Sequence, residues 1–135
     1  MSNVWSGGLG TLLFLSLPWI AYAQSSNEDA KKRHIGCAAV LGAASTVATD
    51  KTLQNKFASG SMLLLSWASE PAAGQSAKAK TDQVTREFAP QVIEIGRAIK
   101  AGTPSAAKEF DAKYGSALKS CESWLAAEIK KRKGS

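Results

Sequence analysis

The chain has 135 residues, a formal net charge of +6 and a sequence pI near 9.5. This length suits one domain with one modest core. The abundance of Ala, Lys, Glu and Leu favours helix and argues against a β-sheet protein, since the hairpin dipeptides Asn-Gly and Asp-Gly are absent. No internal repeat of fixed period is visible.

The first segment predicts an export signal. Met1 to Ala23 contains no charged side chain, and residues 9–17 form an apolar core too short to span a bilayer. Ala21 and Ala23 are small residues at the positions that signal peptidase reads, so we expect cleavage before Gln24 and a periplasmic or secreted protein. The region before the core lacks Lys and Arg, which leaves an uncleaved anchor or a buried helix as alternatives. We assign 1–23 to the signal and 24–135 to one domain.

The first mature helix is expected at about 26–48. Ser25 and Glu28 have the spacing of a capping box, in which each side chain binds a free backbone N–H of the helix start. Helical spacing places four residues on one apolar face, namely Cys37, Leu41, Ala44 and Ala48.

A second helix is expected at about 51–69, capped by Asp50. Its apolar face is broad, which predicts that this helix is the most enclosed of the four. The face comprises Leu53, Phe57, Leu64 and Trp67, widened by Met62, Leu63 and Leu65.

The third helix is expected at about 77–101, with Pro90 causing a kink and Gly102 ending it in a left-handed turn. The fourth is expected at about 104–131, with Thr103 as cap and Pro104 at the first helical position. Apolar faces follow helical spacing in both: Val84, Phe88, Val92, Ile95 and Ile99 in the third, Tyr114, Leu118, Cys121, Leu125 and Ile129 in the fourth.

Short loops between four amphipathic helices predict an all-α, up-down-up-down four-helix bundle. Cys37 follows Ser26 by 11 residues, and Cys121 precedes Arg132 by 11, so both lie about 16 Å from the same end. The two cysteines are therefore expected to form a disulfide between the first and last helices. The alternative is a reactive thiol, because His34 stands three residues before Cys37 and an imidazolium lowers the pKa of a nearby thiol.

The bundle topology brings separate basic runs to one end, which predicts a site for an anionic partner. The expected partner is anionic lipid, lipopolysaccharide or an acidic protein, and nucleic acid is not expected. A solvated surface without a partner is the alternative, since cations also suit a helix C-terminus. The residues are Lys31, Lys32, Arg33, Lys78, Lys80, Lys130, Lys131, Arg132 and Lys133.

Cofactor and catalytic motifs are missing from the sequence. Exported four-helix bundles of this size include the cytochromes c′, which resemble this chain in length and helix count. Their haem is held by C-x-x-C-H, whereas residues 121–125 read C-E-S-W-L, which excludes covalent haem. Non-covalent haem held between His34 and Met62 is a further hypothesis. No metal-ligand spacing and no nucleophile or phosphate-loop motif is present, so no cofactor is predicted and an enzyme is not expected.

The favoured function is thus a structural or binding role, with the basic end contacting an anionic envelope partner. The alternative is a periplasmic carrier or redox protein that uses the bundle core, either for haem or a small apolar ligand or through a redox-active cysteine pair.

Overall fold

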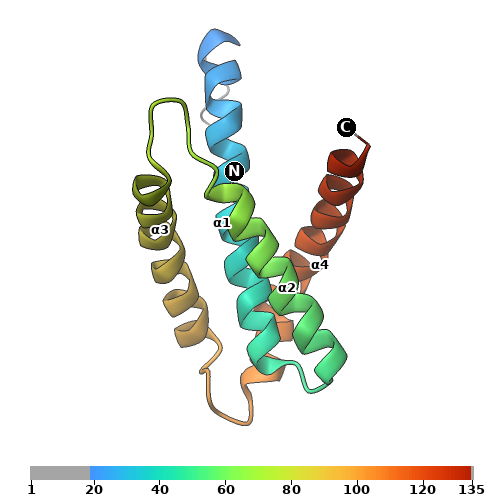
Figure 1. Ribbon diagram of the computed structural model, residues 1–135. Coiled ribbons are helices and arrows are strands. Elements are labelled where there is room, and N and C mark those ends of the chain that lie inside the picture. The colour runs from blue at the N-terminus through green and yellow to red at the C-terminus, as the bar shows by residue number, and fades with distance from the viewer. Residues whose placement is uncertain (1–18, 135) are drawn as a thin grey trace. The chain divides into compact units, whose positions relative to one another are not determined.

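The computed structural model describes residues 19–134 and the side chains from Asp29 onward (Figure 1). The described residues form four helices and no strand, which confirms the all-α prediction. Residues 9–17 of the predicted signal lie outside the described residues. The helices are α1 (Trp19–Val47), α2 (Lys51–Ala68), α3 (Ala77–Ala98) and α4 (Ala106–Lys133).

The chain divides into two units, 1–30 and 31–135, and the contacts that follow all lie within the second. Helix α1 continues across the boundary between them. Among the described residues, no helix combines the length and the apolar character that crossing a membrane would require.

The helix starts match the predicted caps in part. Asp50 caps α2 as expected, because its carboxylate accepts a hydrogen bond from the Thr52 backbone N–H at 3.3 Å. Ser76 caps α3 in the same way, accepting from Ala79 at 3.1 Å. Ser25 does not begin the first helix, since α1 already starts at Trp19.

The connection between α3 and α4 is longer than predicted. Helix α3 passes through Pro90 as one helix but ends at Ala98 rather than near 101. Lys100 (φ 56°) and Gly102 (φ 89°) both adopt left-handed backbone conformations in the turn that follows. The Thr103 hydroxyl donates to the Lys100 carbonyl at 2.7 Å. Thr103 therefore closes this turn instead of capping α4, which begins at Ala106.

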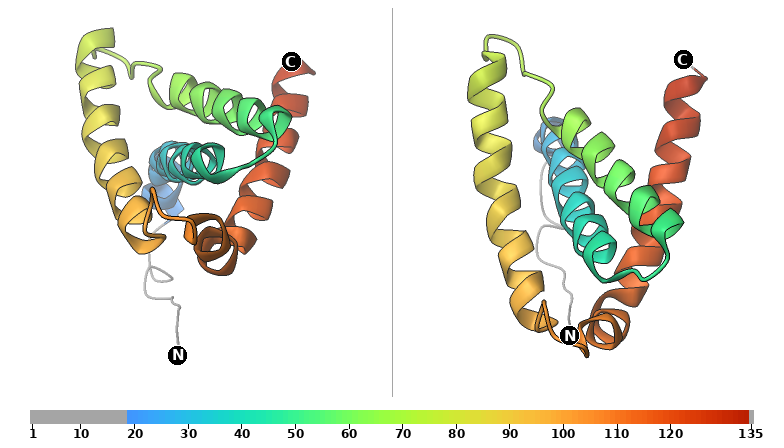
Figure 2. Two further views of the ribbon diagram at one scale, coloured as in Figure 1. Left: turned by 90° about the horizontal axis from the view of Figure 1, so that it is seen from below. Right: turned by 60° about the horizontal axis from the view of Figure 1, so that its bottom comes forward.

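Helix α1 is the most enclosed helix of the unit, and the prediction that the second helix would be so was wrong. Ala38, Ala39 and Leu41 expose at most 1% of their surface, although they point to different sides of α1. On α2, by contrast, Met62 is 72% exposed. Figure 2 shows α2, α3 and α4 arranged around the 31–47 part of α1. Small side chains permit this, because they let three helices approach α1 closely.

Two close contacts fix α2 against its neighbours. The Ser61 hydroxyl, buried in the α1–α2 interface, donates to the Ala38 carbonyl at 2.7 Å. A Cβ atom placed on Gly60 would lie 3.0 Å from Leu125 Cδ2 and 3.3 Å from Leu41 Cδ1. The missing side chain of Gly60 thus lets α1 and α4 pack against α2 at one point.

Candidate functional site

Cys37 of α1 and Cys121 of α4 meet as predicted. Their sulfur atoms are 2.08 Å apart and their Cα atoms 5.5 Å apart, which is disulfide geometry. Both residues are buried, with 8% and 7% of their surface exposed. A buried disulfide is poorly accessible to an attacking thiolate, so this environment favours a structural crosslink over a reactive thiol.

An aromatic cluster lies next to the disulfide. His34 precedes Cys37 by one helical turn, and Trp124 follows Cys121 by one turn. The His34 ring packs between Trp67 at 5.7 Å and Trp124 at 5.1 Å, measured between ring centroids. Trp67, predicted on the apolar face of the second helix, thus packs inward, and together with Trp124 it encloses a histidine.

His34 is held in an apolar environment. It is 5% exposed, and within the described part of the chain neither ring nitrogen has a hydrogen-bond partner. Burial lowers the pKa of His34 below its usual 6.5, and the positive charge of Arg132 lowers it further. The neutral imidazole is therefore the form that the folded protein favours.

Two arginines lie over the tryptophan rings of this cluster. The Arg33 guanidinium lies 5.3 Å from the Trp124 ring centroid, and that of Arg132 lies 4.1 Å from the Trp67 ring centroid. Both distances suit a cation–π interaction. The aromatic cluster thus contacts one cation near the start of the unit, Arg33, and one near its end, Arg132.

The basic runs of the first and last helices converge on Glu70. Lys31 donates to the Glu70 backbone carbonyl at 3.2 Å, and Arg132 lies 3.8 Å from the Glu70 carboxylate. Arg132 also lies 3.8 Å from Glu128. We use the term basic end for the cations of these two runs, namely Lys31, Lys32, Arg33, Lys130, Lys131, Arg132 and Lys133.

The two lysines predicted from the third helix behave differently. Lys78 pairs with Asp82 at 2.9 Å on the exposed face of α3. Lys80 is only 4% exposed, because it precedes buried Val84 by one turn and shares its inward face. Lys80 is thus buried and does not contribute to an anion-binding surface, contrary to the prediction.

The two residues of the haem hypothesis, His34 and Met62, lie in different surroundings. Met62 is 72% exposed on α2, whereas His34 is buried and enclosed by two tryptophans. Helical spacing explains the difference in exposure. Successive residues turn about 100° around a helix, so a residue two positions from a buried one points to the opposite side of the helix. Within the described residues, no group of three or more His, Cys, Asp or Glu side chains could hold a metal ion.

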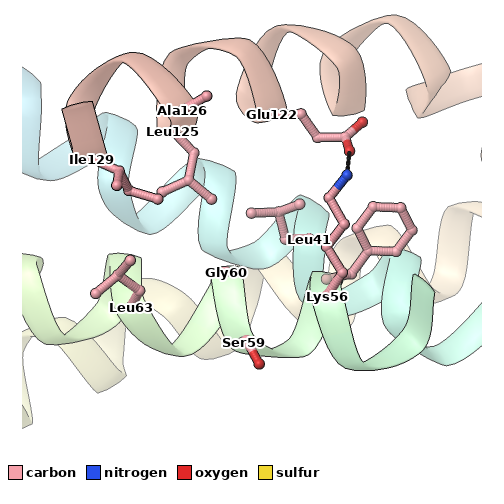
Figure 3. Close-up of a pocket in the computed structure, with 10 residues that line it drawn as sticks. Leu41, Lys56, Ser59, Gly60, Leu63, Glu122, Leu125, Ala126 and Ile129 are labelled. Carbon is pink, nitrogen blue, oxygen red and sulfur yellow. Dashed lines mark ion pairs between the residues drawn. The ribbon is translucent and has the colours of Figure 1, made fainter. Parts of the chain in front are cut away.

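A pocket of about 380 Å³ lies between α2 and α4, with α1 behind it (Figure 3). Leu125 and Ile129 project from α4 toward Leu63 of α2. At the other end of this α2–α4 pocket, Lys56 and Glu122 form an ion pair at 3.3 Å. The lining residues are Leu41, Lys56, Phe57, Ser59, Gly60, Leu63, Glu122, Leu125, Ala126 and Ile129.

No protein-family model, curated protein or solved structure matches the chain.

Two further hollows in the described part of the chain are larger than the α2–α4 pocket, at about 580 Å³ each. One is lined by Lys32, Arg33 and Glu94 among others, and the other follows the α3–α4 turn. Sequence reasoning missed the α2–α4 pocket. The sequence signal that could have revealed this pocket is the pair Gly60 and Ala126, two small residues beside bulky apolar neighbours on facing helices.

Proposed function

We propose that the chain is an exported, non-enzymatic binding protein with an up-down-up-down bundle, whose basic end contacts anionic lipid head groups of the envelope. Export is supported by the apolar segment at 9–17 and by a disulfide-distance cysteine pair, which suits an oxidising compartment.

The bundle topology is supported by the order of the helix contacts. From Ala38 to His34, α1 contacts α2 first at Ser61 and then at Trp67, so these helices run in opposite directions. From Cys37 back to His34, its contacts on α4 advance from Cys121 to Trp124. Gly36 lies beside Gln91 on the opposite side of α1, which supports α3 as a further neighbour.

The observation that carries the binding proposal is the convergence on Glu70. Lys31 from the first helix and Arg132 from the last both contact this residue, so the two basic runs share one end of the unit. Among the described residues, Glu70 and Glu128 pair with Arg132 there, and the seven cations of the basic end exceed these two acids. A surface with this excess attracts anions.

The partly buried tryptophans fit a lipid surface as well. Trp67 and Trp124 each lie beneath an arginine at the basic end. Amphipathic aromatic rings and cations are the residues that favour the boundary between head groups and acyl chains. We therefore favour a lipid partner over an acidic protein.

Vesicle binding tests this proposal. The protein should co-sediment with phosphatidylglycerol vesicles and not with phosphatidylcholine vesicles, and binding should weaken as salt rises. The double variant Lys130→Gln/Lys133→Gln should lower the affinity about thirtyfold, because each cation near an anionic surface contributes about 1 kcal/mol.

The matched control is Lys108→Gln/Lys119→Gln, which removes the same charge from exposed positions elsewhere on α4. The control should retain most of the affinity. Equal losses in the two double variants would show that net charge alone matters. Salt-independent binding, or binding to an acidic polypeptide in place of vesicles, would contradict the proposal.

A carrier function is the second candidate, and the α2–α4 pocket favours it. The redox alternative is less well supported, because the cysteine pair is buried.

A further inference from the structure

We propose that the α2–α4 pocket binds the single alkyl chain of an anionic amphiphile, with the head group held by cations that follow the pocket along α4. This inference rests on the proposed function and specifies its ligand. The pocket supplies the apolar part of the site, and the basic end supplies the charged part.

The lining of the pocket suits a hydrocarbon chain. Its walls are the side chains of Phe57 and Leu63 on α2 and of Leu125 and Ile129 on α4, with Leu41 of α1 behind them. Gly60 keeps the helices close without filling the space between them. A volume of about 380 Å³ is near the lower limit for small-molecule pockets, which favours one chain over two.

The pocket leads into the basic end on the α4 side. Ala126 and Ile129 line it, and the residues one turn further on the same face are Lys130 and Lys133. Both lysines are exposed. A head group at the Ile129 end of the pocket would therefore meet two cations.

The α2 side of the pocket ends in the same place. One turn beyond Leu63 stands Trp67, whose ring lies 4.1 Å from the guanidinium carbon of Arg132. Arg132 also follows Ile129 by one turn on α4. The stacked Arg132 and Trp67 side chains thus lie one turn beyond the pocket lining. Glu70 and Glu128, each 3.8 Å from Arg132, offset its charge, so the head group is assigned to Lys130 and Lys133.

At the opposite end of the pocket, Lys56 and Glu122 form an ion pair, and their charges offset each other. One further cation, Lys119, lies one turn before Glu122 on α4. The pocket is therefore asymmetric, with apolar walls, an ion pair inside one end and the exposed Lys130 and Lys133 beyond the other. This asymmetry matches a molecule with one hydrocarbon tail and one anionic head, and it distinguishes such a ligand from a neutral oil.

Binding of alkyl phosphates tests the assignment. Octyl, decyl and dodecyl phosphate, each below its micelle concentration, are titrated into the full-length protein by calorimetry. One ligand should bind per chain, with affinity rising about fourfold per added methylene until the pocket is full. Dodecyl maltoside, which has the same tail and a neutral head, should bind more weakly by about tenfold.

Two matched variants locate the site. Ala126→Phe places a large ring at the pocket and should lower dodecyl phosphate affinity about tenfold, whereas Ala127→Phe, one residue outside the lining, should change it less than about twofold. Both positions are exposed and helical, so both variants should fold. Ala126→Glu compared with Ala127→Glu repeats the test with a charge that repels the anionic ligand.

The two proposals fail in different ways. If the pocket assignment is correct, Ala126→Phe retains vesicle binding while losing monomeric amphiphile. Vesicle binding without chain-length-dependent binding of alkyl phosphates would overturn the pocket assignment alone, and the reverse result would overturn the surface function alone. Equal losses at 126 and 127 would overturn the pocket assignment. So would a dimer that Ala126→Phe dissociates, because the occupant would then be a second copy of the chain.

Discussion

At the scale of single residues, His34 has the least ordinary environment. A neutral imidazole offers one donor and one acceptor, and both are buried without a partner among the described residues. Unmet polar groups of this kind cost about 1–3 kcal/mol each. Packing of the ring between Trp67 and Trp124 offsets part of this cost.

The buried His34 predicts a loss of stability in mild acid. Its pKa in the folded protein lies below the usual 6.5, because burial disfavours the charged ring. Arg132 and Lys31 lower this pKa further, while Glu128 and Glu70 partly oppose them. Below pH 6.5 the unfolded chain therefore binds more protons than the folded one. The stability that neutral His34 contributes to the folded protein is fully present above about pH 6.5. It is lost as the pH falls toward the lowered pKa.

The variant His34→Phe isolates this effect. Phe keeps a ring between the tryptophans and removes both unmet nitrogens, so we expect equal or higher stability, by up to about 2 kcal/mol, at neutral pH. Urea denaturation between pH 5 and 7.5 should show a smaller pH dependence than in the wild type. An unchanged pH dependence would show that other groups titrate in this range. His34→Ala, which removes the ring, should destabilise at every pH.

At the scale of helices, side-chain size determines how closely neighbours approach. Gly36 and Gly60 are both glycines in helix interiors, but their surroundings differ. A Cβ on Gly36 would lie 3.6 Å from Gln91 Oε1, an ordinary contact, whereas one on Gly60 would lie 3.0 Å from Leu125 Cδ2. The intrinsic preference of a helix for Ala over Gly should therefore be realised only at position 36.

Gly36→Ala is accordingly expected to stabilise the protein by about 0.5–1 kcal/mol. Gly60→Ala should lose that gain, because Leu125 and Leu41 must both move to admit a methyl group. Urea unfolding midpoints of the two variants, compared with the wild type at unchanged slope, measure the difference. Equal gains in stability at both positions would mean that Leu125 and Leu41 can move to admit a methyl group without a loss of free energy.

Helix boundaries were predictable where the cap had only one local partner. Asp50 was identified from the sequence, and its carboxylate does accept from Thr52. Thr103 was also predicted as a cap, and this prediction was wrong because its hydroxyl donates to a competing acceptor, the Lys100 carbonyl. The left-handed conformation of Lys100 produces that acceptor, and nothing in the neighbouring residue types predicts it.

At the scale of the whole molecule, the disulfide joins the first and last helices. It spans 84 residues of sequence, so reduction frees a long loop in the unfolded chain. Loop-closure entropy alone predicts a loss of about 4–5 kcal/mol, which is a large share of the stability of a small domain. Denaturation with and without reductant, and of Cys37→Ala/Cys121→Ala, should both show this loss. A double variant as stable as the wild type would contradict a structural role.

Mass spectrometry without reductant checks the bond itself. The protein should lack two hydrogens relative to its reduced form. After reduction, a thiol reagent should react with the two cysteines only when the protein is denatured. Rapid reduction of the native protein by mild thiols would instead favour the redox alternative.

The sequence by itself determined the four helices, the cysteine pairing and the accumulation of positive charge. Apolar spacing and caps act over one or two turns, a chain with two cysteines allows only one internal pair, and charge is a sum over residues.

Only the tertiary structure decided which side chains are buried and which are exposed. Each residue turns about 100° around a helix, so a small error in the centre of an apolar face exchanges inside and outside. Such an error accounts for Met62, which was placed on an apolar face and is exposed, and for His34 and Lys80, which are buried. The α2–α4 pocket likewise depends on how two helices face each other across Gly60, a relation between segments about 60 residues apart that local patterns do not contain.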